Sequence, residues 1–302
     1  MKSVIRIGSR ESRLAVIQAE IVKKEIQRCH PEIQVELVTM KTTGDKILDK
    51  SLELIGGKGL FVKELDYALM EGRIDLAVHS LKDMPMETSE ELPVLAYTKR
   101  EDPRDALIYK LGLCEIPQGG VIGTSSRRRT LQMKSLHPSC TFRGIRGNVQ
   151  TRLKKLSEEN YDGTILAAAG LKRLGMESVI GRIFEIEEMV PAAGQGILAV
   201  QGRKDEEYRY LDCIRDKESE TAALAEREFV AALGGGCTSP VAAHASVCGS
   251  EIKLTGLYYC EDKDSYVTAV KIGEIKQARQ TGFALAKEMA GKYQVGRIET
   301  RD

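Results

Sequence analysis

The chain of 302 residues has no tryptophan, and aromatic residues make up only 5% of it. No apolar stretch approaches the roughly 20 residues that a helix needs to span a bilayer. The first six residues are interrupted by charge, and we see no targeting segment. These absences argue against a membrane protein and against secretion, so we expect a cytoplasmic protein with no membrane partner.

The cysteines also lack a pattern. There are seven of them, an odd number, widely scattered and without a C-x-x-C pair. This spacing argues against a disulfide framework and against a zinc site. We therefore expect no metal, and we expect most cysteines to be buried as small apolar residues.

An excess of one charge is missing as well. The 45 Lys and Arg residues face 44 Asp and Glu residues, which leaves a net charge of +1. A nucleic-acid binder would need a basic surface interleaved with aromatic rings, and we expect no such partner. The composition, 42% hydrophobic and 29% charged, is that of a globular chain long enough for two or three domains.

One segment departs from this balance. Between Thr124 and Lys155 there is no Asp or Glu, although basic residues are frequent. They are Arg127, Arg128, Arg129, Lys134, Arg143, Arg146, Arg152, Lys154 and Lys155. Unopposed like charge costs self-repulsion unless an anion or a distant acidic surface offsets it. The segment therefore predicts an anion-binding site, with an ordinary solvated face as the alternative.

The setting of this segment favours the site. Residues 121–123 are typical of a short buried strand, residues 124–126 supply capping hydroxyls, and residues 127–135 predict the helix that follows. A helix N-terminus at the end of a strand offers unpaired N–H groups and the positive end of the helix dipole. Arg128 and Arg129 add forked donors that match carboxylate or phosphate oxygens.

Strand and helix periodicities alternate along the first two thirds of the chain. We expect strands at 4–8, 35–40, 74–79, 121–123, 141–144, 164–169 and 197–200, and helices at 14–27 and 61–71. The pattern predicts at least two α/β units with parallel sheets. The segment 191–196 is predicted to cross between them, which makes the second unit an insertion in the first. After residue 216 we expect a helix at 218–233, strands at 241–247, 252–259 and 266–270, and a last helix to residue 292, a smaller α+β domain.

Four shorter features carry chemistry. The strand before His79 ends in a polar cluster with Ser80, Lys82 and Asp83, and ligands bind at the carboxyl ends of strands in open α/β sheets. A polar turn closed by Pro85 is the alternative.

The polar, glycine-rich segment 41–59 is long enough to be a lid. Cys237 follows a glycine run in a loop, where nearby arginines would favour its thiolate. Residues 194–199 match a dinucleotide-binding pattern but precede a strand, so we do not expect a nucleotide there.

In order along the chain, the sequence contains the motifs at 8–10, 56–64, 78–85, 100–105, 123–126 with 128–129, 146–148, 169–175, 194–196 and 236–237. Together these motifs resemble the porphobilinogen deaminase family, also called hydroxymethylbilane synthases. The resemblance extends over nearly the whole chain. It implies two domains like those of periplasmic binding proteins around a cleft, plus a smaller C-terminal α+β domain. The implied boundaries are 1–98 with 192–216, then 99–191, then 217–302.

The resemblance also implies an activity. Enzymes of this family condense four molecules of the small substrate porphobilinogen head to tail, release an ammonia each time, and then hydrolyse off the linear tetrapyrrole hydroxymethylbilane. The chain grows on a dipyrromethane cofactor, which a cysteine holds through a thioether and which stays behind. Every pyrrole ring carries an acetate and a propionate, so the growing chain is a polycarboxylate. The acid-free arginine segment is expected to bind its carboxylates. We expect a monomer.

The resemblance assigns roles to individual residues. Asp83 and Lys82 are expected at the catalytic centre, with Asp83 a carboxylate that binds pyrrole N–H groups and stabilises the cationic methylene-pyrrole intermediate. Cys237 is the expected covalent attachment point of the cofactor. The other expected cofactor contacts are Ser80, Lys82, Asp83, Thr124, Ser126, Arg128 and Arg129. The expected substrate contacts are Arg10, Ser12, Arg146, Arg152, Arg173 and Gln195, and the expected lid residues are Lys58 and Phe61.

Three positions depart from the pattern of the family: Arg13, the pair Gly234 and Gly235 before the cysteine loop, and Arg127. None of them removes a matched functional residue. A ligand-binding module of the periplasmic-binding type, specific for a small polycarboxylate, is the alternative function. Such a module would share the cleft and the arginines but would have no use for Cys237 or Asp83.

Overall fold

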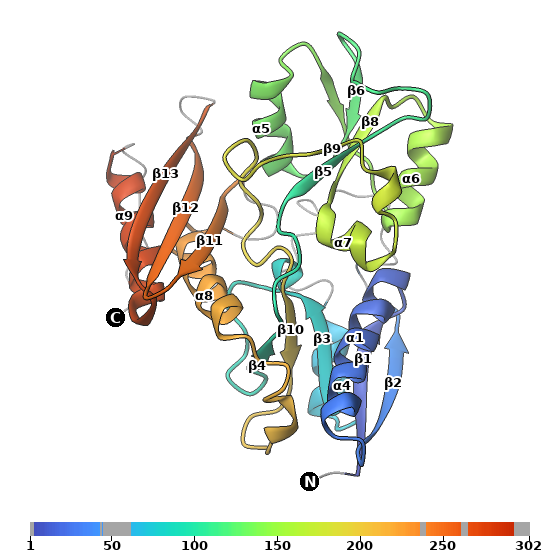
Figure 1. Cartoon of the computed structure of the whole chain (residues 1–302), viewed down its shortest axis with the longest axis vertical. Coiled ribbons are helices and arrows are strands. Elements are labelled where there is room, and N and C mark those ends of the chain that lie inside the picture. Colours follow the sequence, from blue (N-terminus) through green and yellow to red (C-terminus); the bar gives the residue numbers. More distant parts are fainter. Residues whose placement is uncertain (1–2, 43, 45–61, 236–239, 261–264, 293–302) are drawn as a thin grey trace. The chain divides into compact units, whose positions relative to one another are not determined.

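The computed structural model of the chain describes residues 3–42, 44, 62–235, 240–260 and 265–292. The chain forms two compact units, residues 1–101 with 197–220 and residues 102–196 with 221–302. The chain therefore passes out of the first unit, returns to it and leaves it again. The second unit contains both a second α/β sheet and the C-terminal sheet (Figure 1). The division into three domains given above stays a prediction.

The first unit contains a five-stranded sheet with the order β2-β1-β3-β10-β4. Its strands are β1 (Val4–Arg10), β2 (Gln34–Met40), β3 (Leu76–Ser80), β4 (Val94–Tyr97) and β10 (Leu198–Gln201). Strand β1 is parallel to β2 and β3, whereas β10 runs antiparallel to β3 and β4. Short 3₁₀ turns follow β3 (η1, Leu81–Asp83) and β10 (η3, Arg209–Leu211).

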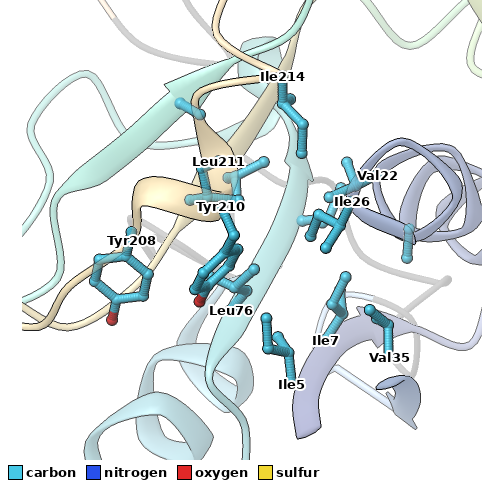
Figure 2. Close-up of a cluster of buried hydrophobic side chains, with 14 of the residues drawn as sticks. Ile5, Ile7, Val22, Ile26, Val35, Leu76, Tyr208, Tyr210, Leu211 and Ile214 are labelled. Atoms are coloured by element: carbon cyan, nitrogen blue, oxygen red, sulfur yellow. The ribbon is translucent and has the colours of Figure 1, made fainter. Parts of the chain in front are cut away.

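Helices α1 (Arg13–Cys29) and α4 (Lys63–Met70) cover opposite faces of this sheet. Successive side chains of β3 point to opposite faces, so each helix packs against alternate residues of the strand. Leu76 and Val78 belong to the apolar cluster that α1 completes, whereas Ala77 belongs to the one that α4 completes. Figure 2 shows the first cluster, in which Val22 and Ile26 of the helix face the strands. Burying each such side chain contributes roughly 1.5–3 kcal/mol.

The second unit repeats this arrangement with the order β7-β6-β8-β5-β9. Its strands are β5 (Asp105–Tyr109), β6 (Val121–Gly123), β7 (Thr141–Arg143), β8 (Gly163–Ala167) and β9 (Arg182–Ile183). Helix α5 (Arg127–Leu136) covers one face of the sheet, and α6 (Val149–Glu158) and α7 (Ala168–Arg173) cover the other (Figure 1). A 3₁₀ turn, η2 (Glu177–Val179), follows α7.

The prediction of parallel sheets is wrong in one respect, because both sheets are mixed. Strand β10 begins just after the chain re-enters the first unit, and β5 begins just after it enters the second. Each of these strands runs antiparallel to both of its neighbours. The sequence pattern marked β10 as a strand but gave no signal for its direction, and β4, β5 and β9 were not predicted.

The C-terminal part of the second unit is the predicted α+β layer. Helix α8 (Lys217–Ala232) leads into an antiparallel sheet of β11 (Ala242–Cys248), β12 (Glu251–Cys260) and β13 (Ser265–Glu274), and η5 (Ile275–Gln277) leads into α9 (Ala278–Lys292). A Cβ atom on Gly256 would lie 2.5 Å from the Phe229 ring, so glycine lets α8 pack closely on β12. The fold class is thus confirmed. Within the described residues no helix is long and apolar enough to cross a membrane.

Candidate active site

The first group of predicted residues lies at one edge of the sheet in the first unit. Strands β1 and β3 are parallel neighbours, with Gly8 opposite Ala77, so their carboxyl ends meet at the same edge. Arg10 ends β1, Ser80 ends β3, and η1 carries Lys82 and Asp83 directly beyond. The structure therefore brings together residues that are about 70 positions apart in sequence.

Two serines at this edge have structural partners. Ser12 is the N-cap of α1, where its hydroxyl accepts a hydrogen bond from the backbone N–H of Ala15 at 3.4 Å. The Ser80 hydroxyl pairs with the amide of Gln18 on α1, which donates to it at 2.9 Å and accepts from it at 3.2 Å. The Ser12 hydroxyl thus caps α1, and the Ser80 hydroxyl holds α1 against the end of β3.

The η1 turn presents Asp83. The backbone N–H of Leu81 donates to the carbonyl of Ile197 at 3.0 Å, and that of Met84 donates to the carbonyl of Leu81 at 3.2 Å. These bonds fix the turn while Lys82 and Asp83 stay half-buried. Within the described residues no donor binds the Asp83 carboxylate, so its oxygens can accept hydrogen bonds from a ligand.

His79 lies beneath this edge and is neutral at neutral pH. Its side chain is buried, and burial lowers its pKa to about 4. Nε2 of His79 lies 3.1 Å from Oε1 of Gln201, whose Nε2 already donates to the carbonyl of Leu92. The Gln201 oxygen must therefore be the acceptor, which places the His79 proton on Nε2. Arg10 lowers and Asp83 raises the pKa of His79, so the charges of both reach this ring.

The second group lies in the second unit, at the end of β6. Ser126 is the N-cap of α5, as predicted, and its hydroxyl accepts from the N–H of Arg129 at 3.5 Å. Thr124 is buried, and its hydroxyl oxygen accepts from the N–H of Ser126 at 3.2 Å. The two hydroxyls set the direction in which α5 leaves the strand.

Arg128 and Arg129 share a carboxylate that the sequence pattern did not reveal. Arg128 Nη1 lies 2.7 Å from Oδ2 of Asp105, and Arg129 Nη2 lies 2.7 Å from Oδ1. All three side chains are buried: the exposed fraction is 6% for Arg128, 8% for Arg129 and 0% for Asp105. Burial by itself would raise the pKa of Asp105, but the two guanidinium groups outweigh it and hold this pKa below its ordinary value. The cluster thus carries one negative and two positive charges.

Other arginines of the acid-free segment also have partners within the protein. The Arg127 guanidinium lies 5.3 Å from the centre of the Tyr259 ring, on β12. Arg143 donates to the carbonyl of Asn160 at 2.8 Å and lies 4.1 Å from the centre of the Tyr161 ring. The counter-charge for part of this run is therefore Asp105, which comes from outside the acid-free segment.

Arg146 and Arg152 flank a tight turn. Gly147 has a φ of +115°, which favours glycine, and Asn148 is the N-cap of α6, with Oδ1 accepting from the N–H of Thr151 at 2.9 Å. Nε of Arg152 donates to the carbonyl of Gly147 at 2.8 Å. Both arginines stay half-buried beside this turn.

The loop 194–196 contains Gln195 and contacts Arg173, the remaining two predicted residues. Gln195 is 1% exposed, and its Nε2 donates to the carbonyl of Pro103 at 2.6 Å and to Oδ1 of Asp105 at 3.0 Å. Nη2 of Arg173 donates to the carbonyl of Gly196 at 2.6 Å. The loop therefore connects to the arginine cluster through Gln195 and to Arg173 through Gly196.

Three predictions fall outside the described residues: the cofactor cysteine Cys237 and the lid residues Lys58 and Phe61. Most of the predicted lid, residues 41–59, lies outside them too. The prediction of buried cysteines is wrong for most of the six described ones. Only Cys260 is buried, Cys29, Cys140 and Cys213 are half-buried, and Cys114 and Cys248 are exposed.

Sequence reasoning missed Asp105 as a partner of the arginines, although the residue belongs to the motif at 100–105. It also missed Asp102, which binds Arg104 at 2.9 Å and Lys172, the residue before Arg173, at 3.3 Å. A polar residue at the start of an otherwise apolar strand was the available signal at Asp105. Nothing in the sequence indicated which helix it would meet.

Two family profiles match the chain. The profile described as "Porphobilinogen deaminase, dipyromethane cofactor binding domain" matches residues 5–210, and the one described as "Porphobilinogen deaminase, C-terminal domain" matches residues 221–291. The first of these covers both groups of site residues described above. Only the segment between the two profiles and the two ends of the chain are left unmatched.

Curated relatives agree with the profiles. Porphobilinogen deaminase of Acetivibrio thermocellus is 53% identical over 285 residues, which are 94% of this chain and 97% of the relative. Porphobilinogen deaminase of Ruminiclostridium josui is 52% identical over 289 residues, again 94% and 97%. Among solved structures, the methionine binding protein MetQ aligns with a TM-score of 0.44 at 13% identity, over 70% of this chain and 88% of that one. On the profiles and the curated relatives, the chain belongs to the porphobilinogen deaminase family.

Proposed function

We propose that this chain condenses four porphobilinogen molecules head to tail on a dipyrromethane cofactor held by Cys237, releases an ammonia at each step and then hydrolyses off the linear tetrapyrrole. The observation that carries the proposal is the match of the two deaminase profiles to residues 5–210 and 221–291. The relatives are covered over 97% of their length. The match is thus to whole enzymes, which favours this function over a binding module for a polycarboxylate.

The residues present fit a cofactor with carboxylate side chains. The cluster of Arg128, Arg129 and Asp105 has a net charge of +1 in a buried position, and an anionic group would neutralise it. Thr124 and Ser126 orient the helix that carries the two arginines, and Ser80 and Lys82 are proposed as further contacts of the cofactor. When bound, the dipyrromethane supplies the pyrrole ring to which the first substrate is joined.

Asp83 is proposed as the catalytic carboxylate, with Lys82 beside it. The aminomethyl group of the substrate is a primary amine with a pKa of about 10, so it is already an ammonium at pH 7 and can leave as ammonia without a proton donor. Asp83 then accepts hydrogen bonds from pyrrole N–H groups and stabilises the positive charge that develops on the substrate. Its lack of a donor within the described residues supports this role. His79 is neutral and keeps the strand end in place.

Arg10, Ser12, Arg146, Arg152 and Arg173 are proposed to bind the acetate and propionate groups of incoming and elongating rings. These arginines are half-buried, which leaves part of each surface open to a ligand. Gln195 is different, because its side chain is 1% exposed and its amide nitrogen donates to two groups of the protein. We therefore assign Gln195 to support of the site rather than to direct substrate contact.

The proposal is tested by intact mass and by one substitution. The purified chain is expected to carry an adduct of two pyrrole units on the peptide that contains Cys237 and on no other cysteine. Asp83→Asn is expected to keep this adduct and to slow turnover by orders of magnitude, because a neutral amide cannot offset the developing cation. Asp83→Glu should retain more activity. An active enzyme with unmodified Cys237, or normal turnover of Asp83→Asn, would contradict the proposal.

We also propose the location, the oligomeric state and the domain division of the enzyme. We propose that the chain acts as a cytoplasmic monomer on a free small molecule, with no nucleic acid and no membrane as partner. The near-neutral charge of +1 supports the lack of a nucleic-acid partner. We further propose the three-domain division with a cleft between the two α/β domains. Light scattering of the purified enzyme should give the mass of one chain, and a dimer would contradict the proposed monomer.

A further inference from the structure

We infer that Asp105 is a positioning residue of the anion site. Its carboxylate holds Arg128 and Arg129 so that one guanidinium edge faces a ligand carboxylate, and through Gln195 it ties both arginines to the loop 194–196. The inference rests on the proposed function, because it concerns how the same site binds the carboxylates of the cofactor.

Strand alternation brings Asp105 to the arginines. Leu107 of β5 lies in the apolar cluster that Met133 of α5 completes. Asp105 is two residues earlier on the same strand, so its side chain faces the same side of the sheet, under α5. Arg128 and Arg129 are in the first turn of α5 and reach down to this position.

Among the described residues, the donors to the Asp105 carboxylate are Arg128, Arg129 and Gln195. Oδ1 of Asp105 accepts from Arg129 Nε at 3.2 Å, from Arg129 Nη2 at 2.7 Å and from Gln195 Nε2 at 3.0 Å. Oδ2 accepts from Arg128 Nη1 at 2.7 Å. A second anchor fixes each guanidinium, because Arg128 Nη1 also donates to the carbonyl of Val190 at 2.8 Å and Arg129 Nη1 to that of Ile165 at 3.0 Å. Neither guanidinium can rotate without losing a buried bond.

The two arginines use different edges. Arg129 presents its Nε and Nη2 edge to Asp105, whereas Arg128 bonds only through Nη1. Among the described residues, Nε and Nη2 of Arg128 have no hydrogen-bond partner. This edge has the fork geometry that binds a carboxylate through two parallel hydrogen bonds. Asp105 therefore neutralises one of two positive charges and leaves one guanidinium edge and one charge for a ligand.

Gln195 extends the arrangement to the loop that contacts Arg173. Its amide joins Asp105 to the carbonyl of Pro103, and the next residue, Gly196, accepts from Arg173 at 2.6 Å. The arginines proposed for the cofactor and one proposed for the substrate are thus fixed by adjacent residues of one loop. Loss of Asp105 should disturb both.

The first test measures the fraction of purified chain that carries the two-pyrrole adduct. Asp105→Asn keeps the shape of the side chain but removes its charge, so both arginines lose their ionic partner. We expect at least a fivefold lower adduct fraction, at a temperature where the chain is still folded by circular dichroism. Asp75→Asn is the matched control. Asp75 is 3% exposed and pairs with Arg6 and Arg203 at 3.2 and 3.4 Å, but it belongs to the first unit, whereas the arginine cluster belongs to the second.

The second test does not depend on loading. In a Cys237→Ala background, which cannot form the thioether, succinate serves as the carboxylate probe and chloride at equal ionic strength as the control. Ligand binding to the folded state raises Tm, and we expect succinate to do so more than chloride. Asp105→Asn no longer orients the Arg128 guanidinium, so one of its two parallel bonds to succinate should be lost and succinate binding should weaken about tenfold. Asp75→Asn should lower Tm but keep the response to succinate.

The outcomes separate the two claims. If the parent chain carries no adduct and does not respond to succinate, the proposed cofactor site fails and the inference about Asp105 fails with it. If the parent responds and Asp105→Asn responds equally, with a normal adduct fraction, Asp105 is only structural. If Asp105→Asn does not fold, Gln195→Met, which removes one donor to Asp105, decides instead. It should shift both readouts in the same direction by a smaller factor, and no shift would overturn the inference.

Discussion

An arginine can bind a ligand only through the guanidinium edge that its protein partners leave unused. Arg127, Arg128 and Arg129 are consecutive in sequence, yet one lies against the Tyr259 ring and two share the carboxylate of Asp105. Removing Asp105 would leave two buried positive charges side by side, which costs far more than the loss of an exposed pair. The residue that governs this site is therefore an acid, located outside the basic segment.

His79 should make the stability of the enzyme depend on pH. Its pKa is lowered by burial from 6.5 to about 4, so below pH 6.5 the unfolded chain binds a proton that the folded chain does not. Stability is thus complete above pH 6.5 and falls as the pH is lowered to about 4, by about 3 kcal/mol. Urea unfolding at pH 7 and pH 4.5 measures this loss. His79→Asn should remove most of the difference, and an equal loss in the variant would contradict the assignment.

The described cysteines should differ in reactivity. Burial and the neighbouring Cys29 thiol raise the pKa of Cys213 to about 11, and its Sγ lies 3.4 Å from the carbonyl of Tyr210. Cys248 is exposed at the end of β11. At pH 8 we expect iodoacetamide to modify Cys213 at least about tenfold more slowly than Cys248, because the thiolate is the reactive form. Peptide mass mapping over time measures both rates, and equal rates would contradict the raised pKa of Cys213.

At the scale of elements, helix caps position the charged side chains. Ser126 caps α5, the helix of Arg128 and Arg129, and Asn148 caps α6. Ser126→Ala and Asn148→Ala should each lower the free energy of unfolding by about 1 kcal/mol. Only Ser126→Ala should also lower the adduct fraction, because α5 carries the arginines proposed for the cofactor. Urea unfolding and intact mass measure the two effects. A normal adduct fraction in Ser126→Ala would show that the cap matters for stability alone.

At the scale of the whole molecule, the proposed arginines should divide the labour by stage of chain growth. Arg128→Gln and Arg129→Gln should yield protein without the adduct, because these residues are proposed to hold the cofactor. Arg152→Gln and Arg173→Gln should keep the adduct and accumulate enzyme with one or more added rings. Intact mass during turnover distinguishes these cases as discrete steps. Equal loss of binding at every stage in all four variants would contradict the division.

Local order followed from the sequence. The alternation of apolar residues predicted most strands and helices, and the hydroxyls before residue 127 predicted the start of α5. The motifs, through their resemblance to a known family, predicted the family to which the chain belongs. These features depend on residues close together in the chain, or on short segments whose composition is itself the signal.

Tertiary structure decided the direction of β10 and β5 and the partner of the arginines. Hydrophobic alternation is the same for a parallel and an antiparallel strand, so only the route of the chain between the two units sets the direction. Likewise Asp105 and Arg128 are 23 residues apart, on a strand and a helix that meet only when the sheet forms. The sequence by itself determined which charges the site contains, and only packing determined which of them remain available to a ligand.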